Sequence, residues 1–171
     1  MPVEKYQTFD GGQKLKSFLQ TSTGAGDAGK PVALNNSGEI DASMLPNREV
    51  DSTTLPASEN LAAGDLVNIW SDSGTLKVRK ADATSSAKRA DGYVLAGVTS
   101  PANAVVFHDG AITGLTSLTV GGRYYLSATA GGLTIEASVP TTTGNLIQFV
   151  GQAVSATKLL YQPDTNPPVI A

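Results

Sequence analysis

A glycine-rich segment near the N-terminus is the first candidate for chemistry. Residues 24–30 read GAGDAGK, which satisfies both G-x-G-x-x-G and the G-x-x-x-x-G-K part of a phosphate-binding loop. Such a loop follows a buried strand, opens a helix, and continues into Ser or Thr, which binds Mg²⁺. Here position 31 is Pro, and the flanking residues indicate neither a preceding strand nor a following helix. We therefore interpret residues 24–30 as a flexible linker of small residues.

The single histidine is the second candidate. His108 precedes Asp109 at the end of an apolar run, and a histidine oriented by a carboxylate can act as a general base. The sequence has no Cys and no G-x-S-x-G motif to supply a nucleophile, and one His is too few for a His-based zinc site. We predict that His108 lies at a surface strand end, and we expect no catalytic residue, cofactor or metal ligand.

Charged side chains cluster in the middle of the chain. Paired carboxylates can hydrolyse glycosides, and grouped cations can face a negatively charged partner. The aspartates all lie in or beside turns, which turn and capping chemistry explains, and the cations alternate with them as on a solvated strand face. We favour these structural interpretations and keep the negatively charged partner as the alternative. The residues concerned are Asp65, Asp72, Asp82, Asp91 and Asp109, and Lys77, Arg79, Lys80, Lys88 and Arg89.

Four aromatic residues could form a platform for sugar rings. They are Trp70, Tyr124, Tyr125 and Tyr161, and each lies in a run of strand-forming residues. We therefore interpret them as core and strand residues.

Composition excludes several classes of protein. The 171 residues contain 12 Lys and Arg against 15 Asp and Glu, so the net charge of −3 argues against binding nucleic acid. The absence of Cys rules out a disulfide framework. No apolar run approaches the roughly 20 residues of a membrane helix, and the chain does not start like a signal peptide. Only 16% of residues are charged, against about 25% in typical domains, and Gly numbers 18, which together favour a β-rich protein.

The pattern from residue 61 onward is that of an all-β domain. Residues 66–70 and 76–79 form a predicted hairpin, and residues 123–127 and 133–136 form another. Further strands are predicted at residues 93–98, 104–107, 145–154 and 158–161. About eight strands at this spacing predict a small barrel or sandwich over residues 58–163, followed by a C-terminal tail at 164–171.

An internal repeat relates the two predicted hairpins. At an offset of 57 residues, Gly64 aligns with Gly121, Gly74 with Gly131, and both hairpins read L-x-x-G, strand, Gly turn, L-x-[VI]. We infer duplicated four-strand halves, expect a pseudo-twofold relation between them, and expect that they could close into one barrel. Unrelated hairpins that merely share glycine turns are the alternative.

The first fifty residues differ from this pattern. Residues 13–20 predict a short helix, while residues 51–60 look like a linker. The apolar residues before the linker are too sparse to close a core and too many for an inert tail. We therefore interpret residues 1–57 as an attachment arm with a linker, whose contacts come from Leu15, Phe18, Leu19, Val32, Leu34, Ile40, Met44 and Leu45.

Three stretches resemble structural proteins of tailed bacteriophages. Residues 27–46 read DAGKPVALNNSGEIDASMLP and resemble a phrase that precedes the main domain of such proteins. Residues 114–127 read GLTSLTVGGRYYLS, and residues 131–134 continue with GGLT. Residues 144–160 read GNLIQFVGQAVSATKLL, so the resemblance covers most of residues 27–161. Such proteins include capsid decoration (cement) proteins, head fibres and tail appendages.

The resemblance implies a non-enzymatic virion protein, and many of these proteins are trimers. A short chain with one compact β-domain and an arm suits a decoration protein or head fibre, because the long repetitive shaft of a tail fibre is absent. The implied partners are the major capsid protein and further copies of the chain, with no nucleic acid and no membrane. The implied location is the outer capsid surface of the virion, after assembly in the host cytoplasm. A tail fibre, collar or baseplate protein is the alternative, and a carbohydrate-binding module or polysaccharide hydrolase is the third possibility.

Overall fold

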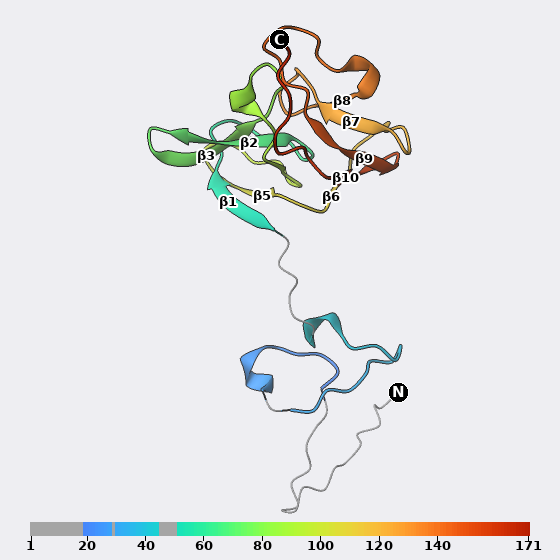
Figure 1. The fold of residues 1–171 in the computed structure, drawn as a ribbon. Coiled ribbons are helices and arrows are strands. Elements are labelled where there is room, and N and C mark those ends of the chain that lie inside the picture. Colours follow the sequence, from blue (N-terminus) through green and yellow to red (C-terminus); the bar gives the residue numbers. More distant parts are fainter. Residues whose placement is uncertain (1–18, 29, 45–50) are drawn as a thin grey trace, which may run out of the picture. The chain divides into compact units, whose positions relative to one another are not determined.

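The structure is a computed structural model that describes residues 19–28, 30–44 and 51–171 (Figure 1). The chain divides into a first unit, Met1–Arg48, and a second unit, Glu49–Ala171. Among the described residues, no helix is both long enough and apolar enough to cross a membrane.

The second unit consists of two antiparallel five-stranded sheets (Figure 1). The first sheet, in the order β1-β5-β4-β2-β3, contains β1 (Ser52–Pro56), β2 (Leu66–Asp72), β3 (Thr75–Lys80), β4 (Gly92–Tyr93) and β5 (Asn103–Phe107). The second, in the order β6-β10-β9-β7-β8, contains β6 (Ala111–Thr113), β7 (Arg123–Leu126), β8 (Leu133–Ile135), β9 (Phe149–Ser155) and β10 (Lys158–Tyr161). The helical elements of this unit are the 3₁₀ turns η3 (Ser86–Lys88) and η4 (Glu136–Ser138). The predicted all-β sandwich is confirmed, but it does not close as a barrel.

Turn chemistry explains the first predicted hairpin. Asp72 pairs with Thr75, so Ser73 and Gly74 form a two-residue turn. Both residues have positive φ, at 53° and 89°. A two-residue turn of this kind matches the right-handed twist of the strands that it joins.

Two apolar cores stabilise the second unit. One lies between the sheets and contains large side chains from both of them, including Leu66, Tyr93, Tyr124, Leu126, Leu159 and Tyr161. The rings of Tyr93 and Tyr161 meet edge to face, with centroids 5.0 Å apart. The other core lies inside the curved first sheet and consists mainly of the smaller residues Ala57, Val67, Val78, Val94, Ala104 and Val106. A parallel bridge between Ala57 and Val78 joins the edges of the first sheet around this core.

The strand orders show that the unit is duplicated. Adding five to each strand number of the first sheet reproduces the order of the second sheet. Gly64 and Gly121 occupy equivalent turns, with φ of 87° and 78°. The Gly64 amide donates to the Val94 carbonyl at 2.8 Å, and the Gly121 amide donates to the Ala153 carbonyl at 2.8 Å. The internal repeat is therefore confirmed, with five strands per repeat rather than four; we call β1–β5 the first repeat and β6–β10 the second repeat.

The two repeats contact each other through different faces. Leu66 and Tyr93 of the first repeat are buried against the second sheet. Their equivalents in the second repeat, Arg123 and Gln152, are exposed. A twofold relation would place equivalent residues in equivalent surroundings. The expected pseudo-twofold arrangement is therefore wrong, and the packing is head to tail.

The segment predicted as a linker belongs to the second unit. Residues 52–56 form β1, which pairs with β5 from Ser52↔Phe107 to Pro56↔Asn103. The C-terminal tail is also paired, because Val169 forms an antiparallel bridge with Leu146. The proposed boundary at residue 57 therefore divides the chain just after a strand of the folded unit.

Candidate functional site

A β-bridge connects two backbone segments of the first unit that lie on either side of the glycine-rich loop. Leu19 and Val32 form a parallel β-bridge, in which the Leu19 amide donates to the Pro31 carbonyl at 2.9 Å. The Ala33 amide donates to the Leu19 carbonyl at 2.7 Å. The helix predicted at residues 13–20 lies outside the described residues up to position 18, and at Leu19 the backbone is bridged as a strand.

Asp27 organises the glycine-rich loop that this bridge closes. Its carboxylate accepts hydrogen bonds from the Thr23 amide at 2.7 Å and the Thr23 hydroxyl at 3.0 Å, and it pairs with the Lys30 ammonium at 2.7 Å. The hydrogen bond from Lys30 and those from Thr23 lower the pKa of Asp27 to about 2. A 3₁₀ turn, η1 (Ala25–Asp27), lies within the loop. The segment predicted as a flexible linker of small residues thus contains a turn held by side-chain contacts, and the Lys30 ammonium pairs with the loop's own carboxylate.

Further polar contacts hold the rest of the first unit. The Asn35 carboxamide oxygen accepts from the amides of Ser37 at 2.9 Å and Glu39 at 3.0 Å, which fixes a tight turn. The Ser22 amide donates to the Ser43 hydroxyl at 2.8 Å. The Asn35 contacts are local, whereas the bond between Ser22 and Ser43 joins segments 21 positions apart.

The predicted attachment residues divide into three sets. Leu15, Phe18 and Leu45 lie outside the described residues. Leu19, Val32 and Met44 come together around a hollow of about 270 Å³ beside η2 (Ala42–Met44). Leu34 and Ile40 do not line it. Val32, Leu34 and Ile40 are 53%, 53% and 49% exposed, so the first unit carries apolar side chains on a frame held by polar contacts.

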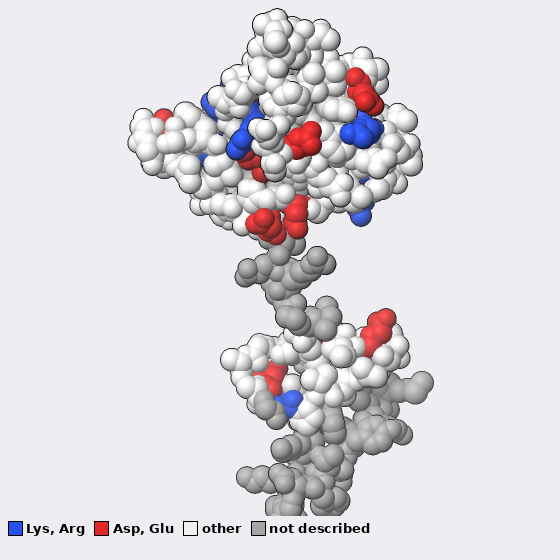
Figure 2. All heavy atoms as spheres, viewed as in Figure 1, with Lys and Arg blue, Asp and Glu red and all other residues white. Residues whose placement is uncertain are grey.

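Four of the five cations in the basic stretch are paired with carboxylates of the second unit. Four ion pairs join Lys77 to Asp72, Lys80 to Asp65, Lys88 to Asp82 and Arg89 to Asp91, at 2.7, 3.1, 2.9 and 3.0 Å. The Arg79 guanidinium donates to the Asn68 side-chain oxygen at 2.9 Å and lies 4.7 Å from the Trp70 ring centroid. In Figure 2 the charged groups are sparse, and several of opposite sign lie near one another. The five cations therefore do not form an unpaired positive patch.

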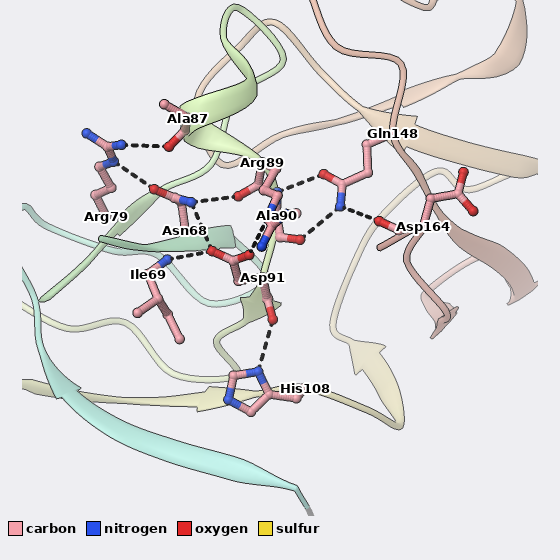
Figure 3. A network of polar contacts seen from close by, with 10 residues as sticks. All are labelled: Asn68, Ile69, Arg79, Ala87, Arg89, Ala90, Asp91, His108, Gln148 and Asp164. Atoms are coloured by element: carbon pink, nitrogen blue, oxygen red, sulfur yellow. Dashed lines mark hydrogen bonds and ion pairs between the residues drawn. The ribbon is translucent and has the colours of Figure 1, made fainter. Parts of the chain in front are cut away.

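His108 and Asp91 belong to a structural network (Figure 3). One Asp91 oxygen accepts from the Asn68 side chain and from the Ile69 amide, each at 2.9 Å. His108 Nδ1 lies 2.9 Å from the Asp91 carbonyl, and Nε2 lies 2.9 Å from the Thr53 hydroxyl. Because a carbonyl only accepts, Nδ1 must donate in this contact. Both ring nitrogens thus connect backbone segments.

Asp109 does not orient the histidine ring in this structure. Its recorded contact is through the backbone, where the Tyr93 hydroxyl donates to the Asp109 carbonyl at 2.8 Å. The half-buried His108 is instead held by groups from β1 and from the residue before β4. The His108 ring therefore connects β1 to the residue before β4, and it is not paired with the Asp109 carboxylate.

The aromatic candidates are divided between the core and its margin. Tyr124 and Tyr161 are buried, whereas Trp70 and Tyr125 are half-buried. Burial raises the pKa of Tyr161, whose hydroxyl has no hydrogen-bond partner among the described residues. Two of the four rings are therefore inaccessible to a sugar.

Two buried amides have important roles that sequence reasoning missed. Gln148 is 1% exposed and bonds to both backbone groups of Ala90, and Asn68 is 3% exposed and bonds to Asp91 (Figure 3). Nothing in a single sequence distinguishes these two from the surface amides, because their importance comes from burial. Gln148 joins the second repeat to the first.

A groove of about 570 Å³ opens in the second unit between residues 114–118 and residues 131–135. Residues 63–65 of the first repeat and the buried Tyr124 also line it. Within the described ranges, no group of three or more His, Asp or Glu side chains could hold a metal ion. Comparison with models of protein families and with curated proteins finds no match to this chain.

Proposed function

We propose that this chain is a non-enzymatic structural protein of a bacteriophage virion, which binds the outside of the capsid and stabilises it. The observation that supports this proposal is the set of apolar side chains that the first unit leaves uncovered. Val32 and Leu34 are each 53% exposed, and Ile40 is 49% exposed. The resemblance of residues 27–46 to phage structural proteins covers these same residues.

The polar contacts that order the backbone of the first unit favour attachment, because they reduce the entropy that binding must cost. Covering apolar surface contributes about 25 cal/mol per Å², whereas ordering a flexible backbone costs about 1–2 kcal/mol per residue. The bridge between Leu19 and Val32 and the contacts of Asp27 and Asn35 already order part of this segment. Less ordering is then left to oppose binding.

The second unit would form the outward part of the bound protein and associate with further copies. The expectation of a trimer comes from the resemblance. Four ion pairs on the second unit balance eight of its charged side chains, which suits a part that faces solvent on a capsid lattice.

Binding to undecorated heads tests the proposal. Leu34→Asp places a charge in the proposed contact, so we expect at least a tenfold loss of affinity, equivalent to about 1.4 kcal/mol. Leu76→Asp is the matched control, because Leu76 is 56% exposed and lies on β3 of the second unit. It should bind as the wild type does.

Two results would contradict this assignment. Unchanged binding of Leu34→Asp would show that the first unit is not the anchor, and an equal loss in Leu76→Asp would show that the effect is not local. Electron microscopy of particles with and without the protein gives its location. Density on the tail instead of the head would favour the tail fibre, collar or baseplate alternative.

A further inference from the structure

In each repeat, the segment that follows the first strand lies near the free edge of the third strand, and we call the line between them a seam. The seam of the first repeat is closed. In the first repeat, the segment after β1 runs back along β3, and Ala57 forms a parallel bridge with Val78. The Ser58 amide donates to the Val78 carbonyl at 2.8 Å, and the Ser58 hydroxyl does so at 3.1 Å. The chain itself thus adds a short parallel strand to the free edge of β3.

The corresponding segment of the second repeat, residues 114–118, makes the equivalent contact at its C-terminal residue. The Leu61 amide donates to the Val98 carbonyl at 2.9 Å, and its equivalent, the Leu118 amide, donates to the Ala156 carbonyl at 3.1 Å. At the offset of 57 residues, the partners of a closed seam would be residues 114–115 and Ile135.

The second seam is nevertheless open. Gly114 and Ser117 have positive φ, at 78° and 59°, and these bends give residues 114–118 a different course from residues 57–61. Within the part of the chain that the structure describes, β8 pairs with β7 and no bridge joins it to residues 114–118. The groove of about 570 Å³ occupies this position.

The walls of the groove define what it can hold. Leu115, Leu118 and Leu133 are half-buried along it, and Ile135 is 45% exposed. Asp65 is the charged residue among those that line the groove, and it is paired with Lys80 at 3.1 Å. An uncharged occupant with small or apolar side chains therefore fits better than a charged one.

We propose that the open seam of the second repeat binds an extended, uncharged polypeptide segment, which adds to β8 as a parallel strand. The closed seam is the template for this complex, because there the backbone of residues 57–58 fills the equivalent place. Main-chain hydrogen bonds to a free sheet edge provide affinity in such complexes, and adjoining pockets provide specificity. This inference goes beyond the proposed function and does not depend on it.

A peptide taken from the closed seam is the direct probe. The capped peptide of residues 53–58, TTLPAS, is added at millimolar concentration to the ¹⁵N-labelled full chain. We expect amide shifts confined to residues 114–118 and 131–135. The same peptide N-methylated at its Ser lacks the donor equivalent to the Ser58 amide and should give at least tenfold weaker binding.

Two variants locate the peptide on the protein. Ile135→Lys places a charge on the rim of the groove and should weaken binding at least tenfold. Val120→Lys is the control, because Val120 is 66% exposed and does not line the groove, and it should bind as the wild type does. Both positions are exposed, so both variants should retain the amide spectrum of the fold.

Three outcomes would overturn the inference. One is the absence of shifts at millimolar peptide. The second is a set of shifts along β3 and β5, which would show exchange with the chain's own β1 rather than binding at the open seam. The third is equal binding of the N-methylated peptide.

Discussion

Replacing Gln148 with Leu should cost far more stability than its conservative shape suggests. The Gln148 side-chain oxygen accepts from the Ala90 amide at 2.7 Å, and its nitrogen donates to the carbonyls of Ala90 at 2.9 Å and Asp164 at 3.0 Å. Gln148 is 1% exposed and Ala90 is 3% exposed. Three backbone groups from two distant segments therefore depend on one buried amide.

The magnitude follows from the groups left without partners. A buried donor or acceptor that loses its hydrogen bond costs about 1–3 kcal/mol. Both groups of Ala90 are deeply buried, whereas Asp164 is exposed, so its carbonyl can bind water. The two Ala90 groups left without hydrogen bonds would together lower the free energy of unfolding by about 2–6 kcal/mol. The greater hydrophobicity of Leu offsets about 1–2 kcal/mol of this loss. We expect a net loss of about 2.5 kcal/mol, the difference between the midpoints of these two ranges.

Urea unfolding of matched variants measures this loss. Gln152→Leu is the control, because Gln152 is exposed and its side chain makes a single recorded hydrogen bond, to the Gly121 carbonyl at 2.9 Å. That variant should change the free energy of unfolding by about 1 kcal/mol or less. If Gln148→Leu is no more destabilising than Gln152→Leu, the reasoning about buried backbone groups is refuted.

Two further predictions concern the chain boundary and acid stability. A chain that begins at residue 51 should fold. A chain that begins at residue 58 lacks β1 and the buried Ala57, so its free energy of unfolding in urea should be lower by about 3 kcal/mol or more. Equal stability of the two chains would show that β1 is dispensable. For Asp82, burial opposes ionisation, but hydrogen bonds from Thr84 and Lys88 outweigh it and lower the pKa of Asp82 below the usual 3.8. The folded state therefore binds this proton less readily than the unfolded state, so the stabilisation is present above pH 3.8 and is lost as the pH falls below it. The urea midpoint should fall less between pH 7 and pH 3 in Asp82→Asn than in the wild type, and identical falls would contradict this assignment.

The predicted hairpins were correct because local chemistry determines them. The strand-forming residues of β2 and the alternating residues of β3 flank a turn whose Gly74 has the positive φ that such turns favour. Gly131 also has a positive φ, of 76°, in the longer loop that joins Leu126 to Leu133 in the second repeat. Signals of this kind lie within a few residues of one another, so they can be read from a single sequence.

The two strands that sequence reasoning missed are equivalent to each other. β1 and β6 are the first strands of the two repeats, and both lie at sheet edges. β1 ends in Pro56, which indicated a linker, and β6 has only three residues. Each is extended because a partner far along the chain, β5 or β10, pairs with it. That partnership is a property of the fold and has no local signal.

The sequence identified some residues of the candidate site but not the contacts that bring them together. The apolar residues of the first unit stand out against their polar surroundings, which was enough to select Leu19, Val32 and Met44. Their meeting around one hollow depends on the Leu19–Val32 bridge and on the bond between Ser22 and Ser43. The sequence shows neither contact, because each joins residues more than ten positions apart.

Head-to-tail packing explains why one seam is closed and the other is open. The interior of the first repeat is filled mainly by Ala and Val, so its edges can approach until Ala57 reaches Val78. The interior of the second repeat must hold its own Tyr and Leu side chains together with Leu66 and Tyr93 from the first repeat. Close packing allows no collapse around this larger volume, so β8 and residues 114–118 stay apart. The same asymmetry leaves Arg123 and Gln152 in solvent, because no further repeat within the described residues packs against them. The free edge of β8 is thus a consequence of which side chains the second repeat must enclose.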